Sequence, residues 1–285
     1  MGQIVARYVI SLEGSPRRKA FFSQPSAQGF KVWNAVDGRT GGGRDRFNVA
    51  GFQSRYGREP LGGEIGCALS HVDLLAHFAA SPGGPNDLMI VAEDDAVLSP
   101  AFEAVVQRIA RRPNFGWANL AQPTEDFRHE PFWAWNRGVL HVSALARPVG
   151  GWPFPWRFRL GASEGPIGGA GLYMVTREAS SALVAHSEAE GVSWVADGFT
   201  DWHEPAGVRF HVLVPNLAGW SGGSEISSDR FHLKETAIPR HSSRLSAWKL
   251  RAYRARRSIG VARRSSIRQA KAEDWIRRPS GDTGQ

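Results

Sequence analysis

Three consecutive carboxylates offer the clearest chemistry in this chain of 285 residues. Glu93, Asp94 and Asp95 directly follow residues 88–92, an apolar run with β-branched members that predicts a buried strand. Ligands of open α/β sheets bind beyond the carboxyl ends of the strands. Adjacent carboxylates repel each other unless a positive group lies between them, so the triplet predicts a divalent-cation site with Asp95 and Glu93 as ligands. The alternative is a strand that ends in a solvated acidic turn.

Residues 63–80, which precede this strand, carry apolar side chains at helical spacing and predict a helix. One apolar stripe consists of Ile65, Leu69, Val72, Ala76 and Ala79. A second apolar face contains Cys67, so the helix is expected to be buried on most sides. Ser70 and His71 are then polar groups on an apolar helix, and His71 is either a ligand-binding residue or a core histidine with satisfied hydrogen bonds.

The elements around these motifs follow from the same patterns. Strands are predicted at residues 5–12, 31–36, 172–176 and 208–215, and helices at residues 101–112 and 177–190. Ser15 and Pro16 fit the N-cap and the first position of a further helix. Alternating strands and helices predict an α/β fold.

These motifs, in this order, resemble glycosyltransferase family 25, the lipooligosaccharide-type sugar transferases whose relatives include collagen galactosyltransferases. Three signature motifs of that family stand here as Gly66-Cys67, Ser70-His71 and Glu93-Asp94-Asp95. The resemblance covers residues 4–230 and includes a small-residue strand at 169–175. It implies a GT-A-like (Rossmann-like) single domain with a mixed, mainly parallel sheet, and a nucleotide-sugar donor.

The resemblance implies inverting, metal-assisted transfer of a hexose, galactose or glucose, from UDP-hexose to a glycan or lipid-linked acceptor in lipooligosaccharide or polysaccharide biosynthesis. Mn²⁺ or Mg²⁺ would neutralise the charge that develops on the diphosphate leaving group. Inverting chemistry implies a carboxylate base. Asp197 is the first candidate, with Asp201 and Glu164 as alternatives. Val195 and Ala196 precede Asp197 where the family has a Pro-Ile-like pair, which is a departure from its pattern.

Donor-binding residues are expected around the first strand–helix turn. Arg17 and Arg18 fall in the first turn of a helix, where positive charge is unfavourable, and a bound diphosphate would explain them. A solvated basic face is the alternative. Asp37 would meet a ribose hydroxyl or a base edge, or is simply a turn residue. The complete set of predicted donor-binding residues is Ser11, Arg17, Arg18, Asp37, Ser70, His71, Glu93 and Asp94.

Residues 113–168 are rich in Pro, Gly and aromatic side chains. Long irregular segments of compact domains are commonly functional. Flat aromatic rings cover the apolar faces of sugars, so Trp133 and Trp135 are predicted to bind the acceptor. The alternative is a loop with a small core of its own.

Charge divides the chain into a predicted catalytic domain at residues 1–238 and a basic tail at residues 239–285. Residues 240–278 hold 13 Lys or Arg and 2 Asp or Glu, a net charge of +11, so the rest of the chain, with +8 overall, carries −3. The tail is expected to be helical or disordered and to bind an anionic membrane surface. Nucleic acid would be attracted by the same charges but is the less expected partner.

A single Cys excludes an internal disulfide and fits a reducing compartment. The N-terminus has no secretory signal and no run of residues is apolar and long enough to span a bilayer. These features predict a cytoplasmic protein that attaches peripherally to the inner face of the membrane.

Two other functions fit parts of the pattern. A sugar nucleotidyltransferase would also use a metal-binding carboxylate, but it needs a Gly-rich, Lys-containing signature after the first strand, where Glu13-Gly14-Ser15-Pro16 stands instead. A non-catalytic protein that binds glycans or nucleic acid through its tail is the other alternative, and the intact acidic motif argues against it.

Overall fold

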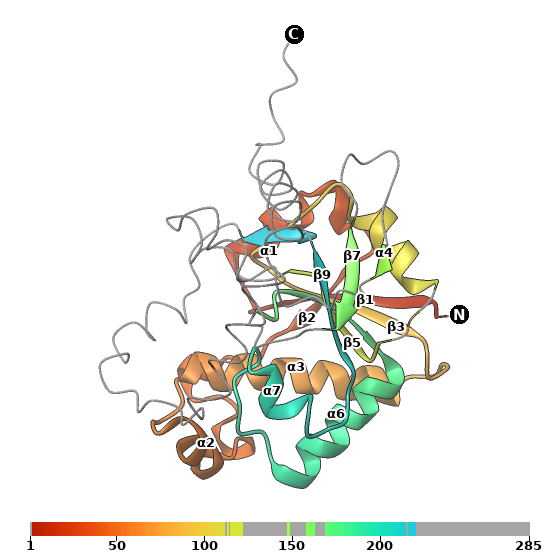
Figure 1. Ribbon diagram of the computed structural model, residues 1–285. Coiled ribbons are helices and arrows are strands. Elements are labelled where there is room, and N and C mark those ends of the chain that lie inside the picture. The colour runs from red at the N-terminus through yellow and green to blue at the C-terminus, as the bar shows by residue number, and fades with distance from the viewer. Residues whose placement is uncertain are drawn as a thin grey trace, which may run out of the picture.

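The computed structural model describes residues 2–111, 113, 115–121, 147–148, 158–162, 169–214 and 216–220. These residues form a three-layer α/β arrangement with the sheet in the middle (Figure 1). Helices α1 (Pro16–Phe22) and α4 (Phe102–Ala110) cover one face of the sheet. The other face is covered by α2 (Val49–Tyr56), α3 (Gly62–Ala80), α6 (Arg177–Glu190) and α7 (Phe199–Trp202).

The central sheet has eight strands in the order β2-β1-β3-β8-β5-β9-β7-β6. In chain order they are β1 (Ile4–Ser11), β2 (Lys31–Asn34), β3 (Leu88–Glu93), β5 (Trp117–Asn119), β6 (Arg147–Pro148), β7 (Arg159–Ala162), β8 (Leu172–Thr176) and β9 (Phe210–Val214). A separate two-stranded ladder pairs β4 (Ala96–Leu98) with β10 (Ala218–Trp220) in antiparallel fashion. The α/β class and the mixed sheet predicted from the sequence are confirmed.

Among the described strands of this sheet, six run in one direction and β7 and β8 run in the other, so the sheet is mixed and mainly parallel in direction, as predicted. β1 pairs in parallel with β2 and β3, and β5 pairs in parallel with β9, whereas the four other pairings of this sheet are antiparallel. The antiparallel pairings come from β7 and from β8, which enters the sheet between β3 and β5 against the direction of both. A strand buried on both faces is apolar throughout in either direction, so its composition does not reveal its direction.

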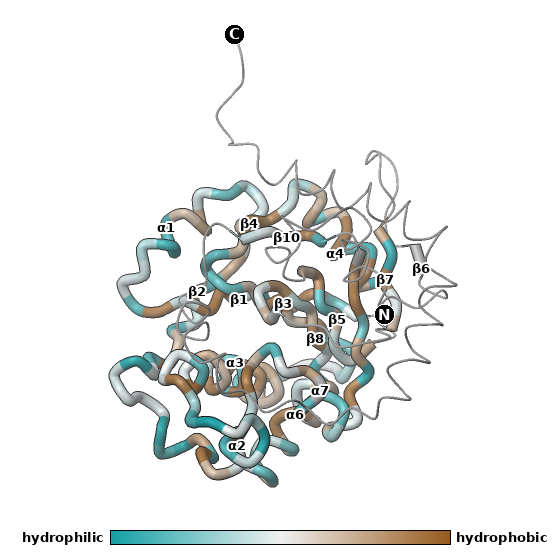
Figure 2. The backbone as a smooth tube through the Cα atoms, turned by 60° about the vertical axis from the view of Figure 1, so that its left-hand side comes forward, coloured by the Kyte–Doolittle hydropathy of each residue, from teal (hydrophilic) through white to brown (hydrophobic). Residues whose placement is uncertain are grey.

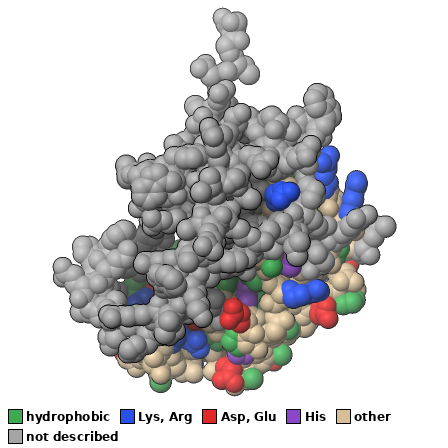
Figure 3. Space-filling view, in the orientation of Figure 1, with side chains coloured by type: hydrophobic (Ala, Val, Ile, Leu, Met, Phe, Trp, Pro, Cys, Tyr) green, Lys and Arg blue, Asp and Glu red, His purple; other side chains and the backbone are tan. Residues whose placement is uncertain are grey.

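Two hydrophobic clusters lie on the two faces of the sheet, and alternate residues of each strand supply them. Leu88 and Ile90 of β3 pack toward α4, while Met89 and Val91 pack toward α3. Hydrophobic residues dominate β3 and β8 near the centre of the tube in Figure 2. Acidic and basic side chains both appear on the uncovered part of the surface in Figure 3. In the described part of the chain, no helix has the length and apolar character needed to cross a membrane.

Close backbone approach fixes α3 against the segment that follows β2. A Cβ atom on Gly66 would lie 2.4 Å from the carbonyl oxygen of Val36, which excludes any larger residue without a shift of the helix. The hydroxyl of Ser70 accepts a hydrogen bond from the Val36 amide at 2.8 Å and donates one to the Gly66 carbonyl at 2.5 Å. The Gly-Cys and Ser-His motifs therefore set the position of this helix under the sheet.

Candidate functional site

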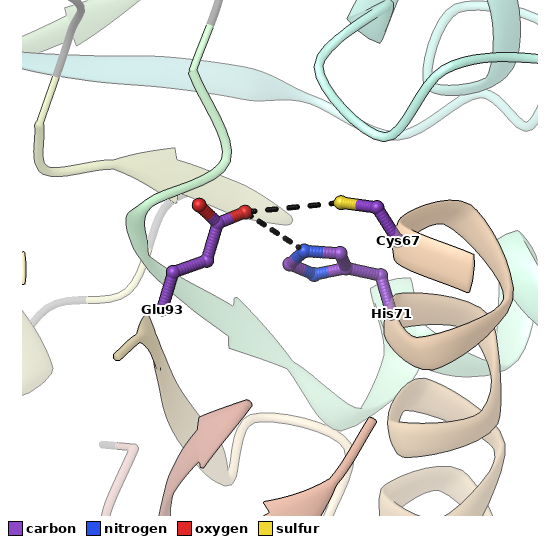
Figure 4. A group of neighbouring side chains, drawn as sticks. All are labelled: Cys67, His71 and Glu93. Carbon is purple, nitrogen blue, oxygen red and sulfur yellow. Dashed lines mark hydrogen bonds and ion pairs between the residues drawn. The ribbon is translucent and has the colours of Figure 1, made fainter. Parts of the chain in front are cut away.

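Three side chains of different chemistry converge where α3 passes the carboxyl end of β3 (Figure 4). Cys67 and His71 stand one turn apart on the same face of α3. Glu93 is the last residue of β3. Its Oε1 atom lies 3.4 Å from Nε2 of His71 and 3.9 Å from Sγ of Cys67. All three atoms lie within 4.8 Å of one another, a spacing that a single cation can bridge. We call this group the Cys67–His71–Glu93 cluster.

A second contact orients the imidazole of His71. Its Nδ1 atom lies 2.9 Å from the hydroxyl of Tyr173 on β8, so Nε2 is turned toward Glu93. Tyr173 is itself fixed by stacking on Trp117, with ring centroids 3.7 Å apart. Burial raises the pKa of Tyr173 well above 10.0, so the phenol stays protonated at neutral pH. The buried His71 ring is thus held by core packing and not by solvent.

Asp95 has a carboxylate with little exposure to solvent and incomplete hydrogen bonding. Its side chain is buried, and Oδ1 has no hydrogen-bond partner among the described residues. Burial and then the neighbouring charge of Glu93 raise the pKa of Asp95 to about 7. Arg17 opposes this shift, with Nη1 at 4.0 Å from Oδ2. A buried, unsatisfied carboxylate oxygen beside a second carboxylate fits the divalent cation expected at Asp95 and Glu93.

Asp94 has a different environment from its two neighbours. It accepts hydrogen bonds from the hydroxyls of Ser11 and Ser15, each at 2.7 Å. Ser15 stands at the N-cap of α1, as predicted, but its hydroxyl does not cap the helix because it donates to Asp94. Arg18 reaches the Leu12 carbonyl at 2.9 Å. The corner formed by the end of β1 and the start of α1 is therefore tied to the acidic turn.

Two of the predicted donor-binding residues have hydrogen bonds that serve the fold. The carboxylate of Asp37 accepts bonds from Nε and Nη2 of Arg39, both at 2.9 Å, and these bonds lower the pKa of Asp37. Asp37 also caps the 3-10 turn at Gly38–Thr40. The hydroxyl of Ser70 is hydrogen-bonded to the backbone of Val36 and Gly66, as described above. Ser11, Arg17, Arg18 and Asp94, by contrast, gather at the β1–α1 corner beside Asp95.

The candidate bases lie in another part of the chain. Asp201, on α7, accepts a short hydrogen bond from the hydroxyl of Tyr56 and lies 3.5 Å from Nη1 of Arg55. These contacts join α7 to α2, so Asp201 has a structural role that weakens it as a base. Asp197 is half-buried in the turn before α7. Glu164, Trp133, Trp135 and the tail from residue 239 lie outside the described residues.

Sequence reasoning missed two members of the site. The sequence pattern places Cys67 on an apolar helix face and in the Gly66-Cys67 motif but not among the site residues, although its position four residues before His71 is the spacing that joins two side chains on a helix. Tyr173 stands in an apolar strand, and nothing in its own neighbourhood marks its hydroxyl as a partner for His71. Its place becomes evident only from the register of β8, in which Tyr173 is opposite Val91.

One comparison with known proteins bears on this site. Residues 4–137 match the family described as Glycosyltransferase family 25 (LPS biosynthesis protein). A search of curated proteins found no match. The matched range contains the whole Cys67–His71–Glu93 cluster together with Asp95 and the β1–α1 corner. The family predicted from the sequence motifs is confirmed as a match over this range: residues 4–137 are similar to glycosyltransferase family 25, a family of transferases described as LPS biosynthesis proteins.

Proposed function

We propose that this chain is an inverting, metal-assisted hexosyltransferase that transfers galactose or glucose from UDP-hexose to a glycan or lipid-linked acceptor. One observation carries the proposal beyond the family: Asp95 is buried at the carboxyl end of β3 beside Glu93, and its Oδ1 atom has no hydrogen-bond partner in the part of the chain that the structure describes. Such a carboxylate is costly without a cation. A cation at this edge of an α/β sheet stands where nucleotide ligands bind.

Asp95 and Glu93 would hold the Mn²⁺ or Mg²⁺, which supplies positive charge to the diphosphate as it leaves. Arg17 lies 4.0 Å from Asp95 and adds a second positive group on the same side. Ser11, Ser15 and Arg18 keep Asp94 and the acidic turn in place. Because Asp95 has a pKa of about 7, a proton competes with the cation near neutral pH.

For the acceptor we propose Asp197 as the base that removes the hydroxyl proton, because Asp201 is bonded to Tyr56. Glu164 remains the alternative, and Trp133 and Trp135 are proposed to bind the acceptor sugar. The catalytic domain would span residues 1–238. The basic tail at residues 239–285 would dock the protein on the inner, cytoplasmic face of an anionic membrane, where a lipid-linked acceptor is found.

Asp95→Asn tests the metal assignment because the amide keeps the shape of the side chain and removes its charge. Titration calorimetry with UDP and Mn²⁺ should show that the variant loses metal-dependent UDP binding. Its melting temperature should not fall, since the amide removes a buried charge. Asp73→Asn is the matched control: this half-exposed carboxylate pairs with Arg46 away from the site and should bind UDP normally. Undiminished UDP affinity in a folded Asp95→Asn protein would refute the assignment.

The donor itself is tested by hydrolysis. A panel of UDP-, GDP- and CMP-sugars, incubated with the full chain and Mn²⁺, should release sugar only from UDP-galactose or UDP-glucose. Sugar release by the wild-type chain that is lost in Asp95→Asn would distinguish a transferase from a non-catalytic binding protein. Formation of a sugar nucleotide from a nucleoside triphosphate and a sugar phosphate would instead support a nucleotidyltransferase.

A further inference from the structure

We propose that the Cys67–His71–Glu93 cluster is a second cation site, selective for a thiophilic divalent ion such as Zn²⁺ or Co²⁺. Its ligands would be Sγ of Cys67, Nε2 of His71 and Oε1 of Glu93, with one position left open. The site is distinct in chemistry from the Mn²⁺ or Mg²⁺ site at Asp95, although both use Glu93. The inference rests on the geometry of these three side chains and does not require the proposed hexosyl transfer.

Two of the three distances in the cluster are close to those of a tetrahedral site. With bonds of about 2.0–2.3 Å from zinc to nitrogen, oxygen and sulfur, tetrahedral angles place ligand atoms about 3.4–3.6 Å apart. Nε2 of His71 and Oε1 of Glu93 are 3.4 Å apart, and Sγ of Cys67 is 3.9 Å from the same oxygen. The third pair, Sγ of Cys67 and Nε2 of His71, lies within 4.8 Å, so ion binding would bring these two atoms closer by at most about 1.2 Å.

The ligand types select the ion. Thiolate and imidazole suit Zn²⁺ and Co²⁺, whereas Mg²⁺ and Mn²⁺ prefer oxygen ligands. Three protein ligands with an open fourth position are typical of zinc sites that also bind a water or a substrate. Without an ion, His71 and the Cys67 thiol both contact the same Glu93 oxygen, and a bound cation would replace these two contacts together. The cation explains all three positions.

The surrounding structure holds the ligands in place before any ion binds. Cys67 and His71 come from one turn of α3, and the Ser70 and Gly66 contacts with Val36 fix that helix. Tyr173 binds Nδ1 of His71, the second contact that metal-binding imidazoles commonly have, and leaves Nε2 for the ion. Glu93 is fixed at the end of the central strand β3, whose backbone continues to pair with β8 through the Gly171 carbonyl at 2.9 Å.

Cobalt titration tests this site directly. The full chain, stripped of metal with a chelator, is titrated with Co²⁺ in the absence of nucleotide. Cys67 is the only cysteine, so a thiolate-to-cobalt charge-transfer band reports this residue alone. We expect the band to saturate at one Co²⁺ per chain and to disappear when Zn²⁺ is added. Mg²⁺ should not displace Co²⁺.

Variants assign the ligands. Cys67→Ser should abolish the band, and His71→Gln should weaken Co²⁺ binding by at least 10-fold. Tyr173→Phe should keep the band but weaken binding about 10- to 100-fold, because it removes only the group that orients His71. His77→Gln is the matched control: this exposed histidine of the same helix contacts Tyr8 and should leave the titration unchanged.

Two results would overturn the proposal: a folded wild-type chain without a charge-transfer band, or Co²⁺ binding that survives Cys67→Ser unchanged. If the serine variant does not fold, alkylation of Cys67 in the wild-type chain decides the matter. Bound Zn²⁺ should slow its reaction with iodoacetamide, and equal rates with and without Zn²⁺ would refute the site. Failure here leaves UDP–Mn²⁺ binding and its Asp95→Asn test untouched, because those are measured with a different ion and variant.

Discussion

The guanidinium of Arg17 lies 4.0 Å from the buried carboxylate of Asp95 and holds its pKa lower than burial and Glu93 alone would set it. Arg17 stands in the first turn of α1, where its charge opposes the helix dipole. The unfavourable position is therefore offset by an interaction with the acidic turn. Under the proposed function, the same guanidinium would also contact the diphosphate of the donor.

Arg17→Gln should weaken UDP–Mn²⁺ binding by about 10- to 150-fold, since a hydrogen bond to a charged group contributes about 1.5–3 kcal/mol. The loss should be larger at pH 6.5 than at pH 8, because without Arg17 the pKa of Asp95 rises further and a proton competes more strongly with the cation. Calorimetry at both pH values measures this. Arg44→Gln, which removes an exposed partner of Glu59, is the control. An equal loss at both pH values would disprove the coupling.

Asp197→Asn should lower kcat by about 10²–10⁴-fold while donor affinity stays near the wild-type value, as expected when a base is removed. Asp201→Asn should instead lower the melting temperature, because it breaks the contact with Tyr56 and Arg55. Steady-state kinetics with a soluble acceptor fragment and thermal melts separate the two effects. Near-normal turnover by a folded Asp197→Asn protein would move the base to Glu164.

Stability should fall below pH 6.5 because of His203. Burial among Trp117, Phe199 and Trp202 lowers its pKa well below 6.5, so the folded chain keeps it neutral. An unfolded chain binds a proton there below pH 6.5, so the free energy of unfolding should drop by up to about 1.4 kcal/mol per pH unit until the folded pKa is reached. Above pH 6.5 this contribution is fully present.

Urea unfolding between pH 5 and pH 8 measures this slope. His203→Phe keeps an aromatic ring among the same neighbours and should flatten it. His77→Gln, which changes an exposed histidine, should leave the slope as in the wild type. An unchanged slope in His203→Phe would assign the acid sensitivity to other groups.

Gly66→Ala should destabilise the fold by about 1–3 kcal/mol through overpacking, because the new methyl would lie 2.4 Å from the Val36 carbonyl oxygen. It should also weaken Co²⁺ binding, since any shift of α3 moves Cys67 and His71 from Glu93. Gly84→Ala is the control, because its new methyl group would lie at an ordinary distance of 4.0 Å from Oδ1 of Asp87. A variant with normal stability and normal cobalt binding would show that α3 tolerates the methyl group.

Truncation after residue 238 should abolish salt-sensitive binding to anionic vesicles and leave hydrolysis of UDP-hexose intact. The reason is the charge division, +11 for residues 240–278 and −3 for the rest. Each basic residue near an anionic surface contributes about 1 kcal/mol. Vesicle sedimentation at two salt concentrations measures the binding. Unchanged sedimentation would refute docking, and lost hydrolysis would place the tail in the catalytic domain.

Elements with strong periodicity were predictable from the sequence. The strand at Leu172–Thr176 and the helix at Arg177–Glu190 have the predicted bounds, and α3 begins one residue before its prediction. Helix α2 was missed because Gly51 interrupts it and Phe52 is its one buried residue, so it has little apolar pattern.

The site was predictable only where its residues are near in sequence. Glu93 and Asp95 follow one strand, and their proximity needs no knowledge of the fold. The contact between His71 and Tyr173 joins residues from distant elements, and it depends on the direction and register of β8. Composition does not encode that register, because β8 is buried on both faces.

The place of β8 between β3 and β5 also sets the order in which the chain can mature on the ribosome. Residues 4–137 carry the family signature, yet β3 has an open edge until residue 176 has been synthesised. A nascent chain would therefore expose the apolar side chains of β3 and the unpaired N–H and C=O groups along its open edge. Such an edge can pair with a wrong strand, and chaperones commonly limit this. Pairing of β8 with β3 would bring Tyr173 to His71, so the imidazole of the Cys67–His71–Glu93 cluster would be oriented only after residue 176 has been synthesised.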